Sequence, residues 1–349
     1  MLPALLYIAA LVGWHLAGLT HLAAWWPYRL ASLFDIWLYL PLPFLLLGAA
    51  LRRRWRAAAL LGLAALVFVL EYGYVFLPKA PTASGVPLRV MTANLLATND
   101  GKGGLGAAVS EQRPDVLAVQ ELTPRLARSL ADQLGPDYPF AALYPSARNP
   151  SLGVYSRHPL REAARSDADD CPCQQVMLDV GGRTVDILNV HPSRPKMTFR
   201  QIGPLPLPSS FDESGHQRAL RAILDRVQAA DGPLIVLGDF NLSDRDPAYR
   251  QLERSLVDAY RAAGWGFGYT FPSRNLSELP SGREVTRPPY FPLLRIDYVF
   301  YSQGLAAVEA RVVDVPGSDH LSVVADLRLQ ADGAARRPED LQTVGGAGR

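Results

Sequence analysis

The sequence has little cysteine and little excess charge of either sign. Among 349 residues there are two cysteines, Cys171 and Cys173, in the stretch DDCPCQQ. One such pair is too few for a disulfide framework, and no other cysteine can complete a zinc site, so we expect free or locally paired thiols. The formal net charge is +2, from 35 Lys and Arg against 33 Asp and Glu. A balance of this kind gives no strong field that would attract nucleic acid.

Long apolar runs, in contrast, are concentrated at the start of the chain. Three segments, 2–24, 30–50 and 57–77, are each close to the roughly 20 residues that a membrane-spanning helix needs. A cleaved signal peptide is the alternative for the first segment, but that segment lacks a basic beginning and a clear cleavage site. Because two more apolar segments follow it, we predict a three-helix transmembrane anchor over residues 1–79.

The charged residues near these segments predict their orientation. Asp35 and Glu71 lie within the apolar runs, where a charge is costly, and we expect both to face the helix bundle or the interface. Basic loops stay in the cytoplasm, so the N-terminus should be cytoplasmic and the chain after about residue 80 should lie outside. The arginines that decide this lie between the second and third segments: Arg52, Arg53, Arg54 and Arg56.

The pattern changes after a linker rich in Pro, Gly and Ser at residues 80–87. Residues 88–329 contain many short apolar strands with a few interspersed helices, among them an amphipathic helix over 215–230. This order predicts an α/β fold in which sheets pack together and helices lie outside them. Residues 330–349 are polar and rich in glycine, which predicts a disordered tail.

Polar side chains follow the apolar strands at the points where the strands end. In PLIVLGDFNLS, Asp239 and Asn241 would share one face if the strand geometry lasted that far. Each such residue alone has a local explanation as a cap or a turn. Six together predict a site at the strand ends, as is common in α/β sheets. The six groups are Asn94; Glu121; Asn189 with His191; Asp239 with Asn241; Asp297; and Asp319 with His320.

The residue types predict the chemistry of this site. Carboxylate and amide oxygens suit a hard cation such as Mg²⁺ or Mn²⁺, whereas a zinc cluster of several His and Cys is absent from the sequence. A histidine beside an aspartate suits proton transfer or the stabilisation of charge in a transition state. A metal together with an aspartate-oriented water describes the hydrolysis of a phosphate ester.

The motifs TANL, VQEL, NVHP, GDFN, RIDYVF and SDHLSV, in this order, resemble the endonuclease/exonuclease/phosphatase superfamily. It includes DNase I-like nucleases, neutral sphingomyelinases and inositol-phosphate phosphatases. The resemblance covers roughly residues 88–329. It implies a four-layered α/β sandwich with two central mixed sheets flanked by helices, and a Mg²⁺ cofactor with Mn²⁺ as the alternative.

The resemblance also implies roles for individual residues. Glu121 would be the principal metal ligand, with Asn94 and Asp319 as the other members of the metal site. The abasic-site enzymes of the superfamily carry an acidic residue where this chain has Leu96, which argues against a second metal site and against DNA repair.

Five further residues would form the catalytic set. His191 would contact the scissile phosphate, Asp239 would orient or deprotonate the attacking water, and Asn241 would hold both the phosphate and that water. Asp297 would orient His320, the catalytic histidine.

Two segments are candidates for binding the substrate. Asn149 and Arg157 lie in 144–160, where the superfamily binds phosphate, and Arg194 and Lys196 follow His191 directly. The loop over 192–215 mixes basic and apolar residues, which suits a phosphorylated lipid at a bilayer surface, although its apolar residues could equally pack beneath the loop. Aromatic residues in 264–294 would suit base stacking in a nuclease, so nucleic acid is the less favoured partner but is not excluded.

Three apolar segments followed by this domain resemble the VanJ-type glycopeptide-resistance proteins of bacteria. That resemblance implies action outside the cytoplasm on lipid-linked cell-wall phosphates. We therefore expect a membrane-anchored, metal-dependent phosphoesterase acting on a substrate like undecaprenyl pyrophosphate, a phospholipid or sphingomyelin. An extracytoplasmic nuclease and an inactive membrane-bound scaffold are the alternatives.

Overall fold

The computed structural model describes residues 1–79, 81–99, 101, 104–147, 151–165, 171–203, 205–273 and 292–331. These residues form two compact units. The first comprises Met1–Leu77 and Lys196–Asp212, and the second comprises Pro78–Pro195 and 213–331. The predicted tail therefore lies almost wholly outside the described residues. The segment 196–212, predicted as part of the catalytic domain, groups with the N-terminal helices instead.

The helices of the first unit are apolar but differ in length. In the described part of the chain, one continuous helix, Trp55–Phe76, is long and apolar enough to cross a membrane. The second predicted span is broken by a bend of 72° between Trp26–Ser32 and Asp35–Leu51, and the first helix, Leu2–Gly18, is shorter. Three membrane spans thus stay a prediction. The helices are α1 (Leu2–Gly18), η1 (His21–Ala24), α2 (Trp26–Ser32), η2 (Asp35–Tyr39), α3 (Leu42–Leu51), α4 (Trp55–Tyr72) and η3 (Gly73–Phe76).

The two acidic residues of these apolar helices have partners on other helices. Oε1 of Glu71 lies 2.9 Å from Nε2 of His15, and Oε2 of Glu71 accepts a hydrogen bond of 3.2 Å from the hydroxyl of Tyr39. Asp35 accepts a hydrogen bond of 3.0 Å from the hydroxyl of Tyr72. Both carboxylates therefore face other helices of the unit, as predicted.

The second unit is built on two six-stranded sheets. In the first sheet, β1 is parallel to β2 and antiparallel to β14, and in the second, β10 is parallel to β7 and antiparallel to β12. The first sheet has the order β13 (Leu305–Asp314), β14 (Leu321–Leu329), β1 (Val86–Asn94), β2 (Val116–Gln120), β4 (Leu152–Ser156) and β3 (Phe140–Tyr144). The second has the order β11 (Val257–Asp258), β12 (Asp297–Tyr301), β10 (Leu234–Asp239), β7 (Arg183–Val190), β6 (Cys173–Val180) and β5 (Leu160–Arg165).

Both faces of the central strands are buried, which explains their continuous apolar runs. Val90 and Ile235 belong to the hydrophobic core between the two sheets. Their neighbours Met91 and Val236 point the opposite way, into the clusters beneath the helices. Each sheet is therefore covered on its outer face, which gives the predicted four layers.

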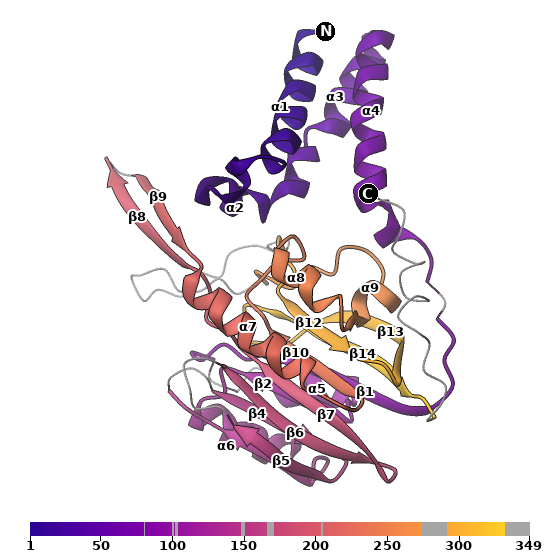
Figure 1. The fold of residues 1–349 in the computed structure, drawn as a ribbon, viewed down its shortest axis with the longest axis vertical. Helices are drawn as coiled ribbons and strands as arrows, with labels where there is room; N and C mark the ends of the chain where they lie inside the picture. The colour runs from indigo at the N-terminus through magenta and orange to yellow at the C-terminus, as the bar shows by residue number, and fades with distance from the viewer. Residues whose placement is uncertain are drawn as a thin grey trace. The chain divides into compact units, whose positions relative to one another are not determined.

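The helices of the outer layers are amphipathic and bury one face each. The first sheet packs against α5 (Leu105–Gln112) and α6 (Pro124–Leu134), and the second packs against α7 (Ser214–Gln228) and α8 (Pro247–Leu252). Figure 1 shows α7 running along the strands of its sheet, against which it packs. The predicted helix over 215–230 is thereby confirmed to within two residues at each end.

A polar network joins the two sheets inside the core. Nε2 of Gln120 donates a hydrogen bond of 2.7 Å to Oδ1 of Asn189, and Nδ2 of Asn189 donates to the carbonyl oxygens of Val119 and Gly153 at 3.1 Å. Gln120 and Asn189 are fully buried. Asn189, which the sequence grouped with the strand-end polar residues, is thus a link between sheets, and it fixes their relative register close to the ends of β2 and β7.

The segment predicted as a long loop after His191 contains two strands. In the first unit, β8 (Lys196–Ile202) and β9 (Leu205–Asp212) form an antiparallel two-stranded ribbon with an irregularity between Thr198 and Phe199 (Figure 1). Every residue of this hairpin apart from Met197, Ser210 and Phe211 is exposed where the structure describes it.

Candidate active site

Three neighbouring strands of each sheet bring polar residues to the same edge of the molecule. Parallel strands end at one edge, and the antiparallel strand beside them begins there. Across the sheets, Nδ2 of Asn94 donates a hydrogen bond of 3.0 Å to Oδ2 of Asp239, so the two edges meet. The first sheet supplies Asn94, Glu121, Asp319 and His320, and the second supplies His191, Asp239 and Asp297.

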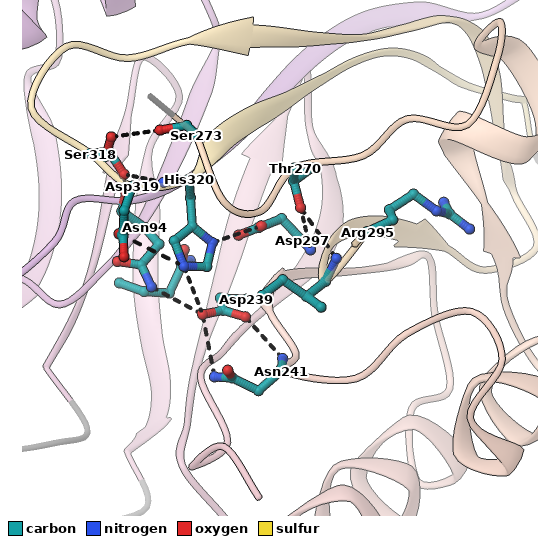
Figure 2. A network of polar contacts seen from close by, with 12 residues as sticks. Asn94, Asp239, Asn241, Thr270, Ser273, Arg295, Asp297, Ser318, Asp319 and His320 are labelled. Atoms are coloured by element: carbon teal, nitrogen blue, oxygen red, sulfur yellow. Dashed lines mark hydrogen bonds and ion pairs between the residues drawn. The ribbon is translucent and has the colours of Figure 1, made fainter. Parts of the chain in front are cut away.

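Asp239 is the centre of this arrangement and is almost fully buried. Its Oδ1 accepts a hydrogen bond of 2.9 Å from the backbone N–H of Asn241. Its Oδ2 accepts from the side-chain amides of Asn94 and, at 3.3 Å, Asn241. Nε2 of His191 lies 3.5 Å and Nε2 of His320 lies 3.8 Å from the same oxygen. These contacts hold one carboxylate oxygen at the point where both histidines converge. Figure 2 shows Asp239 between His320 and Asn241.

The turn after β10 places Asn241, and it differs from the predicted extended strand. The strand ends at Asp239, and Asn241 has a left-handed backbone with φ of 50°, a conformation that asparagine tolerates. Gly238 is required just before it, because a Cβ there would lie 2.0 Å from the carbonyl oxygen of Val190 on β7. The amide of Asn241 therefore folds back onto Asp239 and also donates to the carbonyl of Pro192 at 3.1 Å.

His320 and Asp297 form a buried pair. Nδ1 of His320 donates a hydrogen bond of 2.9 Å to Oδ2 of Asp297, whose own N–H donates to Oγ1 of Thr270 (Figure 2). Burial lowers the pKa of His320, but the charges of Asp297 and Asp239 outweigh it and raise this pKa to about 10. The pairing fixes the ring so that Nε2 faces Asp239, and it favours the cationic imidazolium.

Ser318 links the end of β1 to the residue that precedes β14. Its hydroxyl donates a hydrogen bond of 2.6 Å to the carbonyl of Asn94 and accepts one of 3.0 Å from the N–H of His320. Ser273 in turn donates to the carbonyl of Ser318 at 2.8 Å. Neither serine was predicted from the sequence; the one signal was the position of Ser318 directly before Asp319 and His320.

Glu121 is held beside Asn94 by an unusual backbone. It follows β2 with φ of 57°, a left-handed conformation that costs energy for a glutamate and that often marks functional sites. Its Oε2 accepts a hydrogen bond of 2.7 Å from the N–H of Ala97, and its Oε1 accepts one of 3.3 Å from Asn94. Oε1 also lies 3.9 Å from Nε2 of His191. Unlike Asp239, this carboxylate is partly exposed.

The residues predicted to hold a metal offer a suitable donor set. Glu121, Asp319 and Asn94 present oxygen ligands, which a hard divalent cation prefers. The pKa of Asp319 is raised, mainly by burial. The charge of His320 lowers this pKa, and the charge of Glu121 raises it further. Two carboxylates that repel each other in this way are stabilised by a cation between them. The residues therefore fit a divalent metal.

A second group with metal-binding side chains consists of Asp239, Asp297 and His320, whose ligand atoms lie within 4.8 Å of one another. Nδ1 of His320 and Oδ2 of Asp297 are, however, engaged in their mutual hydrogen bond. This group therefore has two of its donor atoms already paired, and both it and the oxygen donors around Glu121 could hold a divalent metal.

The chain around His191 is fixed at three successive residues. The N–H of His191 donates a hydrogen bond of 3.0 Å to the carbonyl of Pro172, and Asn241 holds the carbonyl of the next residue. Nδ1 of His216, at the start of α7, donates to the carbonyl of Ser193 at 2.8 Å. His216 is buried, and burial lowers its pKa. It was not predicted, and its signal was a histidine on the buried face of an amphipathic helix.

Pro172 lies between two cysteines that form a disulfide. Cys171 and Cys173 are bonded to each other and are both buried in the core beneath α7. The thiols are therefore locally paired, one of the two predicted states. The pairing closes the loop whose carbonyl receives the N–H of His191.

The four residues predicted to bind substrate are not brought to the site together. β4 runs antiparallel to β2, so Arg157 at its end lies at the opposite edge of the sheet, where its guanidinium is 5.1 Å from the ring centre of Tyr138. Asn149 lies outside the described residues. Arg194 is exposed close to His191 in the chain, and Lys196 is exposed at the start of β8 in the first unit.

A buried ion cluster supports the strand that carries Asp297. Arg295 pairs with Asp258 and Asp244, and its guanidinium points away from His320 (Figure 2). Burial raises the pKa of Asp244, but Arg295 and Arg261 outweigh it and lower this pKa to about 2. The cluster is structural, although it is only two residues from the site.

A family model for the endonuclease/exonuclease/phosphatase family matches residues 91–320, a range that contains every strand-end residue of the site. The chain belongs to this family. Family members are hydrolases that act on phosphate esters and typically depend on a divalent metal. The narrower resemblance to VanJ-type proteins stays a prediction.

Three solved structures are each similar to 70% of this chain, and the first of them shares its fold. A family protein from Bacteroides thetaiotaomicron is 16% identical with a TM-score of 0.50, and the match covers 70% of this chain and 98% of that one. One from Beutenbergia cavernae DSM 12333 is 23% identical with a TM-score of 0.48, covering 70% and 72%. The catalytic domain of human nocturnin is 20% identical with a TM-score of 0.45, covering 70% and 96%. The comparison with curated proteins gives no match.

Proposed function

We propose that this protein is a membrane-anchored, divalent-metal-dependent phosphoesterase that hydrolyses a phosphate ester or pyrophosphate of a lipid-linked substrate outside the cytoplasm. The observation that carries the hydrolytic part is the convergence on Asp239 of two histidines and two amides, with the oxygen donors of Glu121 and Asp319 beside them.

The side chains divide the work of hydrolysis between them. Oδ2 of Asp239 orients the attacking water and accepts its proton. The amide of Asn241 and the imidazole of His191 bind the oxygens of the phosphate. His320, kept cationic and oriented by Asp297, stabilises the charge that develops on the phosphoryl group. A divalent metal held by Glu121, Asn94 and Asp319 would supply further positive charge to the phosphate.

Three features of the chain support a membrane-bound enzyme that acts outside the cytoplasm. The outward face of α4 exposes large apolar side chains, which lipid would cover: Leu63, Leu66, Val69 and Leu70. The arginine loop before α4 favours a cytoplasmic position for that end of the helix. A disulfide such as Cys171–Cys173 persists in oxidising compartments and is rare in the cytosol.

The alternatives are weaker on the same observations. A nuclease of this family would need a basic channel that contacts several phosphates, whereas the chain carries a net charge of only +2. An inactive scaffold would have no reason to retain the complete set of carboxylates, amides and histidines at one edge.

A hydrolysis panel tests the proposal. The full-length protein in detergent would be supplied with Mg²⁺ and either undecaprenyl pyrophosphate, sphingomyelin, other phospholipids or plasmid DNA. We expect cleavage of a lipid-linked phosphate by the wild type and a loss of activity in His320→Ala. The matched control is His158→Ala, because His158 follows β4 at the opposite edge of the first sheet.

The outcomes separate the three hypotheses. Cleavage of DNA alone would refute the lipid substrate, and equal inactivity of wild type and His320→Ala on every substrate would refute the enzyme. The orientation is tested separately with a reporter enzyme fused after residue 80 that is active on one side of the membrane only. A cytoplasmic signal there would overturn the proposed location.

A further inference from the structure

The β8–β9 hairpin exposes large apolar side chains that nothing in its own unit covers. None of the three hydrophobic core clusters found among the described residues contains a residue of this hairpin. Four of its large apolar side chains are exposed: Phe199 at 58%, Ile202 at 57%, Leu205 at 62% and Leu207 at 45%. Exposed apolar surface that is concentrated on a narrow ribbon of this kind marks an interaction site.

These side chains are concentrated towards the end of the ribbon. Ile202 and Leu205 are paired directly across the two strands next to the turn at Gly203, and the next pair on that face is Arg200 with Leu207. Opposed residues of an antiparallel pair lie on the same face, so one face carries three aliphatic side chains and one cation. Phe199 lies on the other face, opposite Pro208. The tip is therefore apolar on both faces.

The backbone of β9 argues against a protein strand as the partner. Pro206 and Pro208 have no N–H and cannot donate hydrogen bonds to an added strand. A surface that is apolar on both faces and short of donors along one edge suits the interfacial region of a bilayer better than it suits a second sheet.

The charges of the hairpin match the depth of a lipid headgroup layer. Arg200 is two residues before Ile202, which is about 7 Å along a strand, and apolar elements at an interface are buried by about 5–10 Å. The side chain of Arg200 can thus keep its charge among lipid phosphates while its stem lies in the apolar region. Lys196, six residues from the tip, is about 20 Å away and lies beyond this layer.

We propose that the tip of this hairpin, Phe199–Leu207, inserts into the headgroup region of an anionic lipid bilayer. Within the same compact unit lie the apolar helices of the N-terminus, and β9 contacts α2 there. The inference rests on the membrane anchoring in the proposed function and is independent of which phosphate ester is cleaved. The hairpin begins five residues after His191 in the chain.

Site-directed spin labelling of the full chain in vesicles of phosphatidylcholine and phosphatidylglycerol tests this. Nitroxides are attached to the single introduced cysteine of Ile202→Cys, Lys196→Cys or Val67→Cys, the last on α4. We expect the nitroxide at position 202 to collide more often with oxygen, which partitions into lipid. The nitroxide at position 196 should collide more often with a water-soluble nickel chelate. Adding Phe199→Ser and Leu205→Ser should move the label at 202 into water, because these exposed side chains support no core.

The labels on α4 and on the hairpin distinguish this inference from the anchoring itself. A label at 202 in water with the α4 label in lipid would overturn the insertion of the hairpin and leave the anchor standing. Both labels in water would overturn the anchor as well. A label at 202 that stays in lipid after both serine substitutions would refute the role of the apolar side chains.

Discussion

Replacing Asp297 with asparagine tests whether this buried carboxylate acts through His320. The substitution keeps the size of the side chain and removes its negative charge. The hydrogen bond of 2.9 Å that Nδ1 of His320 donates to this side chain would then have a neutral acceptor. Bonds to charged groups contribute about 1.5–3 kcal/mol and neutral ones about 0.5–1.5 kcal/mol, so the weakened bond alone predicts a loss of about tenfold in kcat/KM. If the amide also selects the wrong tautomer of the imidazole, the loss approaches about 10⁴-fold, as in the serine-protease triad.

Asp258 provides the matched control. It is as buried as Asp297 and lies on the neighbouring strand β11, but its carboxylate pairs with Arg295 instead of a histidine. Asp258→Asn removes one of the two carboxylates that pair with the buried guanidinium of Arg295, the other being Asp244, and should cost about 3 kcal/mol of stability. Asp297→Asn should cost less, because His320 can lose its proton when its charge partner is removed, whereas an arginine cannot.

The assay measures kcat/KM on the substrate found active in the hydrolysis panel, together with urea unfolding of the same detergent-solubilised protein. Asp297→Asn should lose activity and keep its fold, whereas Asp258→Asn should lose its fold. A value of kcat/KM for Asp297→Asn within about twofold of wild type would refute the argument, because twofold corresponds to about 0.4 kcal/mol, well below the roughly 1.4 kcal/mol of the expected tenfold loss. Equal destabilisation by both substitutions would assign Asp297 to the core instead.

Three other residues give sharper tests of positioning, stability and metal binding. His216→Leu removes the donor to Ser193 and should lower kcat by about tenfold at unchanged KM, whereas His216→Asn, which can still donate, should restore it. Asp244 titrates near pH 2 in the fold against 3.8 in model compounds, so its stabilisation is present above pH 4 and lost as pH falls to 2. Unfolding of Asp244→Asn should lack this step of roughly 2 kcal/mol. Glu121→Gln should raise the Mg²⁺ concentration for half-maximal activity by at least about tenfold, as measured after chelation and stepwise return of the metal.

The strands that carry the site were predictable because their signals are local. The apolar run before Asp239 and the one before Glu121 are buried on both faces, so each reads as a continuous strand in the sequence. The polar residue that ends each run marks the strand end to within one or two positions. The family resemblance then supplied the roles, which burial and spacing alone do not determine.

The elements that were missed lack such signals. β13 mixes alanine and valine with the charged residues Glu309 and Arg311 without a regular alternation, and it pairs with β14 through a register irregularity after Ala307. β9 carries prolines at two alternate positions, a pattern that argues against a strand within a larger sheet. Both depend on tertiary pairing, which the sequence does not state.

The position of Arg157 shows a different limit. Its strand was predicted, but strand direction within a sheet follows from topology, and β4 turned out to run away from the site. Asn189 was grouped with the strand-end residues for a similar reason, since a residue near a strand end can face the other sheet as readily as the solvent. His216 was overlooked because its partner, Ser193, is distant in the sequence.

The two sheets present the site with nearly equivalent scaffolds. Each offers the end of a central strand, the position after its parallel neighbour, and the position where its antiparallel neighbour begins. An approximate twofold relation therefore passes between the sheets, and it pairs Asn94 with Asp239, Glu121 with His191, and Asp319–His320 with Asp297.

The symmetry of the backbone means that topology alone does not distinguish the half proposed to bind metal from the half proposed to activate water. The two halves differ in the side chains at matched positions. The difference is smallest between Asn94 and Asp239, whose side chains are nearly the same size and are hydrogen-bonded to each other. Exchanging these two residues would keep both strands and the bond between them. It would move one negative charge from the half proposed to orient water to the half proposed to bind metal. The fold would then be kept, but no carboxylate would remain in place to orient the water.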